Sequence, residues 1–389
     1  MRCYTRQIES TVIRLTNMAV IRPINMGRQS RKYNPRTRTK RPVGLQLDAD
    51  QSPGKPHPMP SKIGDRWFLP DPLGARLHQK SGLGIVIENG VSLLPIEVLF
   101  CHWNRHVPIP EEWVSEIISE DPDFIAKSVV FDVSRSGGEI VIPTENCANV
   151  VCADNSFAVK WSRNQSHFKG KPISQVRWFW ASSDVDWDEL RVWVDEVTLE
   201  DCIPEVFVID DEMDITMYRL SYEILSGNQK TWSDLSNTEI DQISDIMAMR
   251  KSTKSGCYLP DVTKWPLNSI GIEHLSGINL RHEEISWIKT KLNSQNSNED
   301  DLISHLIDAG CILRPGFKYG CKWRVYDDEV SKSHAPWLLQ PCSEAPESWE
   351  NLCLAVRLAE GVHKKWICGF NSDDQWKFIN IKRWLPGRV

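Results

Sequence analysis

The sequence predicts an α+β protein made of two tandem copies of one unit. Each unit has an N-terminal α/β subdomain and a C-terminal mixed-sheet subdomain. Three segments of the first half recur in the same order in the second: residues 84–98 at 271–285, 187–194 at 349–356, and 207–220 at 368–381. The first of these alignments has no gap, and the second shares Trp-x-x-Leu. Repeated order with small changes of offset is what the duplication of a two-layer unit leaves behind.

These repeats define the domain boundaries that we expect. The first unit covers residues 65–222 and the second covers residues 261–389. Between them, residues 223–260 are rich in Ser, Asn, Gln, Thr and Lys, and their pattern predicts one helix near Asn237 to Met249. We therefore interpret residues 223–260 as a linker.

The end of the second unit has the clearest local signals. Apolar residues recur at helical spacing and predict one buried stripe: Leu352, Ala355, Val356, Ala359 and Val362. Ser348 is placed to cap the start of this helix, and Gly361 to stop it. A buried strand is then expected over residues 365–370, a polar turn over 371–375 and a closing strand over 376–384.

Residues 1–64 form a basic extension, which we expect to be disordered. They hold 13 Lys and Arg against 3 Asp and Glu, so the rest of the chain is strongly acidic although the net charge is only −6. Such an arm adds phosphate contacts that do not depend on sequence. No run of 18 apolar residues predicts a membrane span, and no secretory signal is evident, so we expect a cytoplasmic protein.

The 11 cysteines contain no Cys-x-x-Cys pair. Cys101, His102 and His106 come nearest to a metal cluster, but no second ligand pair follows at zinc spacing. Cys202, Cys353 and Cys368 lie inside apolar segments, where a free cysteine acts as a small hydrophobic residue. The sequence therefore predicts no disulfide framework, no metal site and no cofactor.

Three residues of the second unit have the chemistry for metal-independent cleavage of RNA: Tyr326, His334 and Lys364. A base removes the proton of a ribose 2′-OH, an acid protonates the departing 5′-oxygen, and a cation holds the charge on the phosphoryl oxygens. The pKa of histidine is ordinarily close to neutral, and lysine is a compact cation. Taken singly, each residue has an ordinary explanation, as a strand tip, a solvated loop histidine or a surface lysine.

The order and the amino-acid sequences of the segments around these residues change that interpretation. Gly-Phe-Lys-Tyr-Gly precedes Trp-Arg-Val-Tyr, Ser-His precedes a hydrophobic strand, and Ala-Val-Arg-Leu-Ala is followed by Val-His-Lys-Lys. These motifs resemble those of the archaeal tRNA-splicing endonucleases, and the resemblance is strong over residues 301–389. The resemblance implies a nuclease-like subdomain with Tyr326 as general base, His334 as general acid and Lys364 as transition-state stabiliser. The loop before His334 is slightly short, and His363 stands where the family often has Arg.

The resemblance also implies a substrate and an assembly. The family cuts precursor tRNA at bulge-helix-bulge junctions and leaves a 2′,3′-cyclic phosphate and a 5′-OH. Members with one defunct and one working unit form homodimers, in which an acidic turn of the defunct unit docks on the partner. Here that turn is Asp210, Asp211, Glu212 and Asp214. Arg357 and Arg383 match the pair that sandwiches a bulged base, since a guanidinium stacks on a π-face while it stays charged.

The first unit has lost the three residues. The repeat sets Ile203 or Cys202 against Lys364, and a trial alignment of the strand after His334 sets Asn155 against that histidine. One alternative is therefore a non-catalytic RNA-binding or assembly subunit, which the intact second unit argues against. Another is a metal-dependent nuclease, but the Asp/Glu-x-Lys tripeptide common in that class occurs nowhere in the sequence.

Overall fold

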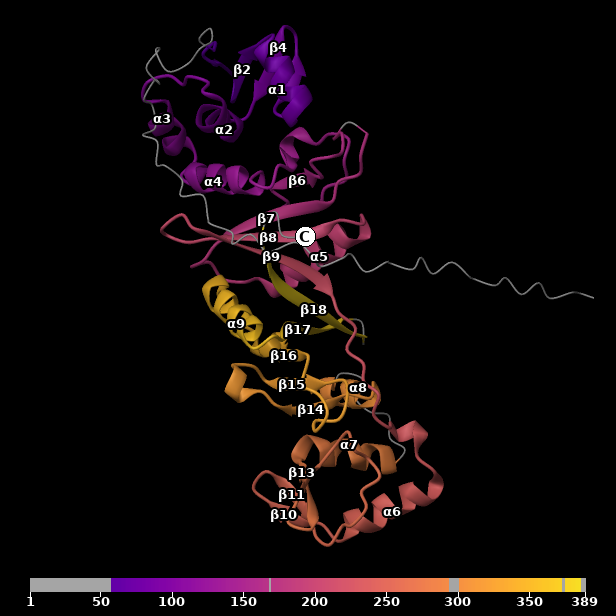
Figure 1. Ribbon diagram of the computed structural model, residues 1–389. Helices are drawn as coiled ribbons and strands as arrows, with labels where there is room; N and C mark the ends of the chain where they lie inside the picture. The colour runs from indigo at the N-terminus through magenta and orange to yellow at the C-terminus, as the bar shows by residue number, and fades with distance from the viewer. Residues whose placement is uncertain (1–56, 168, 294–300, 373–374, 386–389) are drawn as a thin grey trace, which may run out of the picture. The chain divides into compact units, whose positions relative to one another are not determined.

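The computed structural model describes residues 57–385, except residues 168, 294–300 and 373–374 (Figure 1). Most of the expected basic extension, residues 1–56, therefore lies outside the described residues. Its last part does not: strand β1 (Ser61–Ile63) pairs antiparallel with β2 (Arg66–Pro70). The prediction of disorder is thus wrong for Ser61–Ile63, because these residues complete a sheet.

The described residues form a mixed sheet of ten strands, in the order β14-β15-β16-β17-β18-β9-β8-β7-β6-β5. Its strands are β5 (Ile140–Pro143), β6 (Ala158–Trp161), β7 (Ser174–Trp180), β8 (Ile203–Ile209), β9 (Ile215–Tyr222), β14 (Ile312–Pro315), β15 (Trp323–Tyr326), β16 (Trp337–Pro341), β17 (Lys365–Ser372) and β18 (Gln375–Trp384). β16 and β17 run parallel, as do β7 and β8, and every other neighbouring pair is antiparallel. The expected α+β class with a mixed sheet is confirmed.

One helix crosses over between the strands of each parallel pair, as parallel pairing requires. Helix α5 (Trp187–Leu199) joins β7 to β8, and α9 (Trp349–Gly361) joins β16 to β17. Ser348 caps α9 as expected, because its hydroxyl accepts a hydrogen bond from the backbone N–H of Asn351.

The stripe and the stop predicted for α9 are correct only in part. Leu352, Val356 and Ala359 are buried, but the side chain of Val362 is 42% exposed, because the helix has already ended at Gly361. His363 rather than Gly361 adopts the left-handed conformation, with φ 56°. The two strands that follow reach slightly further into the expected turn than the sequence indicates, and residues 373–374 of that turn lie outside the described residues.

Two small sheets complete the β structure, with the orders β1-β2-β4-β3 and β10-β11-β13-β12. Their remaining strands are β3 (Ile85–Ile87), β4 (Gly90–Leu93), β10 (Lys251–Thr253), β11 (Gly256–Leu259), β12 (Ile272–His274) and β13 (Gly277–Arg281). The second sheet corrects the expected linker, residues 223–260. Because β10 and β11 lie inside that range and β11 pairs with β13, the range contains half of a folded sheet.

The other helices, in chain order, are α1 (Leu73–Ser81), α2 (Pro95–Arg105), α3 (Trp113–Glu120), α4 (Phe124–Ser134), α6 (Asn237–Ala248), α7 (His282–Leu292) and α8 (Leu302–Asp308). Of these, α1 and α7 pack on the small sheets, and α4 and α8 contact the large one. Helix α6 lies where the sequence predicts it. No helix in the described part of the chain has the length and apolar character that crossing a bilayer requires.

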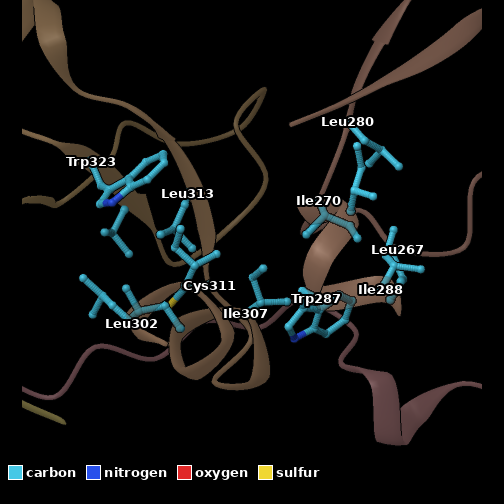
Figure 2. Packing of buried hydrophobic residues seen from close by; sticks show 14 of the residues in the cluster. Leu267, Ile270, Leu280, Trp287, Ile288, Leu302, Ile307, Cys311, Leu313 and Trp323 are labelled. Atoms are coloured by element: carbon cyan, nitrogen blue, oxygen red, sulfur yellow. The ribbon is translucent and has the colours of Figure 1, made fainter. Parts of the chain in front are cut away.

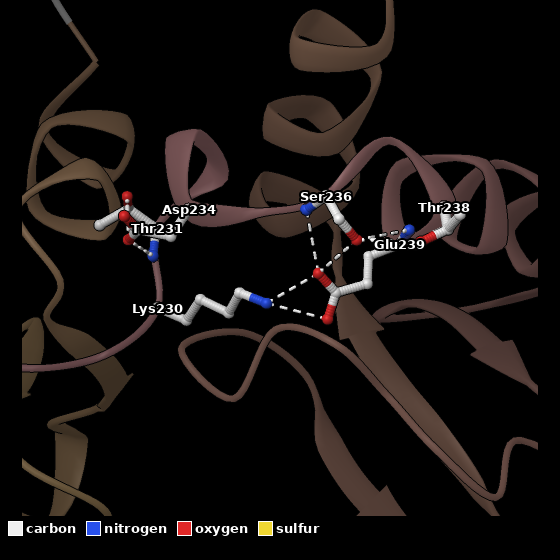
Figure 3. A network of polar contacts seen from close by, with 6 residues as sticks. All are labelled: Lys230, Thr231, Asp234, Ser236, Thr238 and Glu239. Atoms are coloured by element: carbon white, nitrogen blue, oxygen red, sulfur yellow. Dashed lines mark hydrogen bonds and ion pairs between the residues drawn. The ribbon is translucent and has the colours of Figure 1, made fainter.

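Polar contacts over residues 230–239 hold the start of α6 (Figure 3). The hydroxyl of Ser236 and the carboxylate of Glu239 form a capping box. The amine of Lys230 donates to both carboxylate oxygens of Glu239 at 2.8 Å, and this contact, together with the hydrogen bonds from Ser236, lowers the pKa of Glu239 to about 2. Local sequence thus defines this helix start, even though the range as a whole is not a linker.

A continuous apolar core connects the second small sheet to the large one. Figure 2 shows part of it: Leu267, Ile270, Leu280, Trp287, Ile288, Leu302, Ile307, Cys311, Leu313 and Trp323. The side chain of Trp287 is fully buried. Side chains of this size each contribute about 2 to 3 kcal/mol when they leave water. The core therefore anchors β14 and β15, the strands that lead into the candidate site.

A buried ionic cluster joins β18 to the first half of the sheet. Lys160 and Glu205 have fully buried side chains, and their charged atoms lie 2.6 Å apart. Arg219 donates to the second oxygen of Glu205 at 2.8 and 2.9 Å. The ring of Trp384, at the end of β18, contacts both cations, 4.3 Å from the Lys160 amine and 4.2 Å from the Arg219 guanidinium. These cation–π contacts stabilise the β9–β18 pairing.

Candidate active site

Tyr326, His334 and Lys364 all lie near one end of three neighbouring strands. Tyr326 is the last residue of β15, His334 precedes β16 by three residues, and Lys364 directly precedes β17. Because β15 runs antiparallel to β16, and β16 runs parallel to β17, the end of β15 and the starts of the other two strands meet at one edge. The sheet topology thus brings the three segments together.

Ala335 is the contact point between these segments. The amine of Lys364 donates a hydrogen bond of 2.5 Å to the carbonyl oxygen of Ala335. Ala335 also packs with Tyr326 in a small buried cluster, and it directly follows His334. The side chain of Tyr326 is 5% exposed, that of Lys364 is partly buried and that of His334 is exposed. The imidazole is therefore open to a substrate, while the tyrosine and the lysine are held in place.

Arg324 is a site residue that the sequence analysis missed. It precedes Tyr326 by two positions, so both side chains lie on the same face of β15. The Arg324 guanidinium donates a hydrogen bond of 3.0 Å to the phenol oxygen of Tyr326 and one of 3.1 Å to the carbonyl of Pro315. It also lies 5.6 Å from the centre of the Tyr319 ring. The alternation in Trp-Arg-Val-Tyr is the signal from which Arg324 could have been predicted.

Lys364 differs from its neighbour Lys365 in its surroundings. Burial lowers the pKa of Lys364, and the nearby charge of Arg324 lowers it further. Its amine lies 6.0 Å from the centre of the Tyr319 ring. Lys365 instead forms an ion pair of 2.5 Å with Glu223. Of the two side-chain amines, that of Lys364 donates to the segment carrying His334, whereas Lys365 meets this segment through its backbone N–H, which donates to the carbonyl of Pro336 at 2.9 Å.

Arg357 and Arg383 lie on α9 and β18, and both are exposed. They approach the same buried contact, between Tyr218 and Cys353. Burial and then the Cys353 thiol raise the pKa of Tyr218, and the charges of Arg383 and Arg357 oppose that rise. Within the described residues, no hydrogen bond or ring contact joins either arginine to the three catalytic candidates.

The acidic turn is the hairpin between β8 and β9. Asp210, Asp211, Glu212 and Asp214 are all exposed. The Asp210 carboxylate accepts hydrogen bonds from the backbone N–H groups of Glu212 (3.0 Å) and Asp214 (2.9 Å). These bonds fix the shape of the hairpin and leave the other carboxylates at the surface.

A phenol, an imidazole and an amine near one sheet edge suit acid–base chemistry on a phosphodiester. In such chemistry one group takes up a proton, a second group gives one up, and a cation faces the charge on the phosphoryl oxygens. Arg324 adds a second cation beside the phenol. The fold and the site together fit the class of RNA-cleaving enzymes.

Comparison with known proteins finds similarity to one particular family. Residues 301–378 match the family model for the tRNA intron endonuclease, catalytic C-terminal domain. The chain is 29% identical over 177 residues to a tRNA-splicing endonuclease of Thermoplasma volcanium, covering 46% of this chain and 54% of that protein. For a tRNA-splicing endonuclease of Picrophilus torridus the values are 27% over 176 residues, 45% and 54%. For one of Methanopyrus kandleri they are 27% over 85 residues, 22% and 48%.

The region that matches the family model, residues 301–378, contains some of the predicted site residues and leaves out others. The C-terminal part of the chain carries a tRNA intron endonuclease catalytic domain, and Arg324, Tyr326, His334, Arg357 and Lys364 all lie inside it. Arg383 and the hairpin of residues 210–214 lie outside it. The chain spans about half the length of the curated relatives that it matches.

Proposed function

We propose that this protein is a tRNA-splicing endonuclease of the archaeal type, which cuts precursor tRNA at bulge-helix-bulge junctions between exon and intron. The observation that carries the proposal is a matched catalytic domain in which the segments of Tyr326, His334 and Lys364 converge on Ala335. Bulges suit this reaction because attack by the 2′-OH needs a flexible phosphodiester and because proteins read splayed bases in RNA.

In the proposed reaction Tyr326 is the general base, His334 the general acid and Lys364 the transition-state stabiliser. Tyr326 takes the proton of the ribose 2′-OH, and the 2′-oxygen forms a bond to the adjacent phosphorus. The bond from phosphorus to the 5′-oxygen breaks, and His334 gives that oxygen a proton. Lys364 faces the negative charge on the phosphoryl oxygens. The products are a 2′,3′-cyclic phosphate and a 5′-OH, and no cofactor takes part.

We further propose that the two halves of the chain are copies of one unit. The register of β9 against β18 supports this, since Leu220 pairs with Ile381 and these residues are 161 positions apart, which is the offset of the repeat. Two other pairs exchange with one another under the same offset: Tyr218–Arg383 and Tyr222–Ile379. A twofold axis through the Leu220–Ile381 pair would produce this pattern.

The first copy is proposed to be non-catalytic. The strand order sets β6 against β15 and β7 against β16, so Trp161, at the end of β6, takes the place of Tyr326. Under the proposed duplication this correspondence replaces the trial alignment of Asn155 with His334, which sets β6 against β16. Ile203 and Cys202 stand where the second copy has Lys364, so the first copy has neither the phenol nor the amine.

The proposed assembly is a homodimer with two active sites. The exposed hairpin with Asp210, Asp211, Glu212 and Asp214 supports docking on a basic surface of the partner's catalytic unit. Arg357 and Arg383 are proposed to sandwich a bulged base of the substrate. Their exposure and their shared approach to Tyr218 support a common RNA-binding surface.

The test is cleavage of an intron-bearing precursor tRNA by the purified full chain in the presence of EDTA, with both ends mapped. We expect cuts at the two junctions, with cyclic phosphate and 5′-OH ends. His334→Ala is expected to slow cleavage sharply while RNA binding persists. Binding without cleavage by the unaltered chain would favour a non-catalytic subunit, and activity only with added magnesium would favour a metal-dependent nuclease.

A further inference from the structure

We propose that the turn of Phe317, Lys318 and Tyr319 binds an unpaired nucleotide of RNA beside the cleavage site, with Phe317 stacking on the base and Lys318 contacting a phosphate. This inference rests on the proposed function, because it names a binding site for the same substrate. The three residues form the 3-10 helix η4 (Phe317–Tyr319) between β14 and β15.

The exposure of Phe317 is the first observation. Its side chain is 75% exposed, although phenylalanine is ordinarily among the buried residues. The neighbouring amine of Lys318 lies 5.9 Å from the centre of the ring, and Lys318 is exposed as well. An exposed ring beside a cation is the combination with which proteins bind single-stranded nucleic acid, because every base has a π-face and every nucleotide a phosphate.

The second observation is that hydrogen bonds and two glycines define the shape of the turn. The backbone N–H of Tyr319 donates to the carbonyl of Gly316 at 2.7 Å, and that of Gly316 donates to Lys322 at 2.9 Å. Gly320 has φ 68°, in the left-handed region, and a side chain at Gly316 would collide with Cys321. The sequence thus holds the turn in a shape that displays Phe317. A preorganised surface loses little entropy when a ligand binds.

The third observation is a chain of contacts from the turn to the candidate active site. The Tyr319 ring lies 5.6 Å from the Arg324 guanidinium and 6.0 Å from the Lys364 amine. Arg324 in turn holds the phenol oxygen of Tyr326. A nucleotide bound at Phe317 would therefore continue directly into the residues proposed to act on the phosphodiester.

RNA fits this surface better than a protein partner does. The acidic hairpin of a second copy would present carboxylates, for which a phenyl ring offers no favourable contact. Three cations lie in or beside the turn, at Lys318, Arg324 and Lys364, so a bound nucleotide would meet an exposed ring with its base and positive charge with its phosphates.

The experiment uses the full chain and a bulged RNA that carries 2′-deoxynucleotides at the cleavage positions, so that it binds without being cut. Fluorescence anisotropy measures its Kd. Phe317→Ala is expected to raise the Kd by about 5- to 150-fold, the range for the loss of one base–aromatic stack, and Phe317→Trp is expected to keep tight binding. Leu199→Ala is the matched control, since Leu199 is an equally exposed apolar residue (81%) outside the catalytic domain.

Lys318→Gln tests the phosphate contact. It is expected to reduce the slope of log Kd against log salt concentration by about 0.7, the value for one single-strand phosphate. Fully paired RNA of the same length should bind equally to the original chain and to Phe317→Ala, because it offers no unpaired base.

The outcomes separate this inference from the proposed function. If the unaltered chain does not cut the unmodified bulged RNA, the proposed function fails and the inference fails with it. If it cuts that RNA and Phe317→Ala binds as tightly as the original, the inference alone is overturned. If Phe317→Ala changes the sedimentation of the RNA-free protein and leaves its RNA affinity unchanged, the turn is a protein contact. That result also overturns the inference.

Discussion

The side-chain amine of Lys364 donates a hydrogen bond of 2.5 Å to the backbone carbonyl of Ala335. This bond ties the start of β17 to the segment that carries His334. Lys364 therefore has two possible effects on cleavage, one through its charge and one through the position of the histidine. Substitutions at Lys364 and at its neighbour separate the site cation from an ordinary surface lysine.

Lys364→Met is expected to slow cleavage of precursor tRNA by about 100- to 1,000-fold, the cost of removing one preorganised donor from a developing negative charge. RNA affinity should persist. Lys365→Met is the matched control, because it removes a partly exposed ion pair with Glu223 and leaves the backbone hydrogen bond from Lys365 to Pro336 in place. Single-turnover cleavage and equilibrium binding measure the two effects. Equal loss of activity in both variants would contradict the assignment.

The amine of Lys364 should react unusually fast with acetic anhydride. Its pKa is lowered from 10.5 by burial and then by Arg324. At any pH below 10.5 a lowered pKa leaves a larger neutral, nucleophilic fraction, and the advantage disappears as the pH rises past 10.5. Arg324→Gln removes one cation, so the pKa of Lys364 should rise and the labelling should slow. Mass spectrometry of competitively labelled protein measures the rate, and faster labelling in Arg324→Gln would refute the prediction.

Arg324 should act through the phenol of Tyr326 when it contributes to cleavage. Arg324→Gln and Tyr326→Phe are each expected to slow the reaction, and the double variant should be no slower than Tyr326→Phe alone. The guanidinium has no phenol oxygen to hold once that oxygen is gone. Single-turnover rates for the four proteins form a double-mutant cycle. Additive losses would show that the two residues work independently.

Glu205→Gln should destabilise the fold by about 3 to 5 kcal/mol, because it leaves the fully buried amine of Lys160 without a counter-charge. Urea unfolding followed by circular dichroism measures the change. Asp201→Asn is the control: its pair with Lys171 spans 4.0 Å and both side chains are 88% exposed, so no measurable loss is expected. Similar losses in the two variants would mean that burial does not determine the cost.

Sequence reasoning located those parts of the fold whose signals are local. The helix Trp349–Gly361 was found from its apolar spacing and from Ser348, because both signals lie within a few residues of the helix itself. The linker prediction failed for a different reason. Strand β11 is short, and what makes it part of a sheet is pairing with β13, which starts about twenty residues later, so composition alone could not show it.

The candidate site shows the same division. Tyr326, His334 and Lys364 are predicted from the sequence motifs of three separate segments, and the strand order explains how those segments meet. The role of Ala335 as the acceptor for Lys364 could not be predicted, because every residue has a backbone carbonyl and the sequence does not show which one accepts this hydrogen bond. Arg324 was predictable in principle from the period-two pattern of a strand, which sets it on the face of Tyr326.

The pairing of β9 with β18 also has a consequence for the chain during its synthesis. During synthesis the edge of β9 remains without this neighbour while about 150 further residues are added, which takes about 8 to 30 s at ordinary rates of translation. Exposed strand edges invite pairing between chains, so the nascent protein is open to such pairing throughout this interval. Any truncation that removes Gln375–Trp384 would make that transient vulnerability permanent.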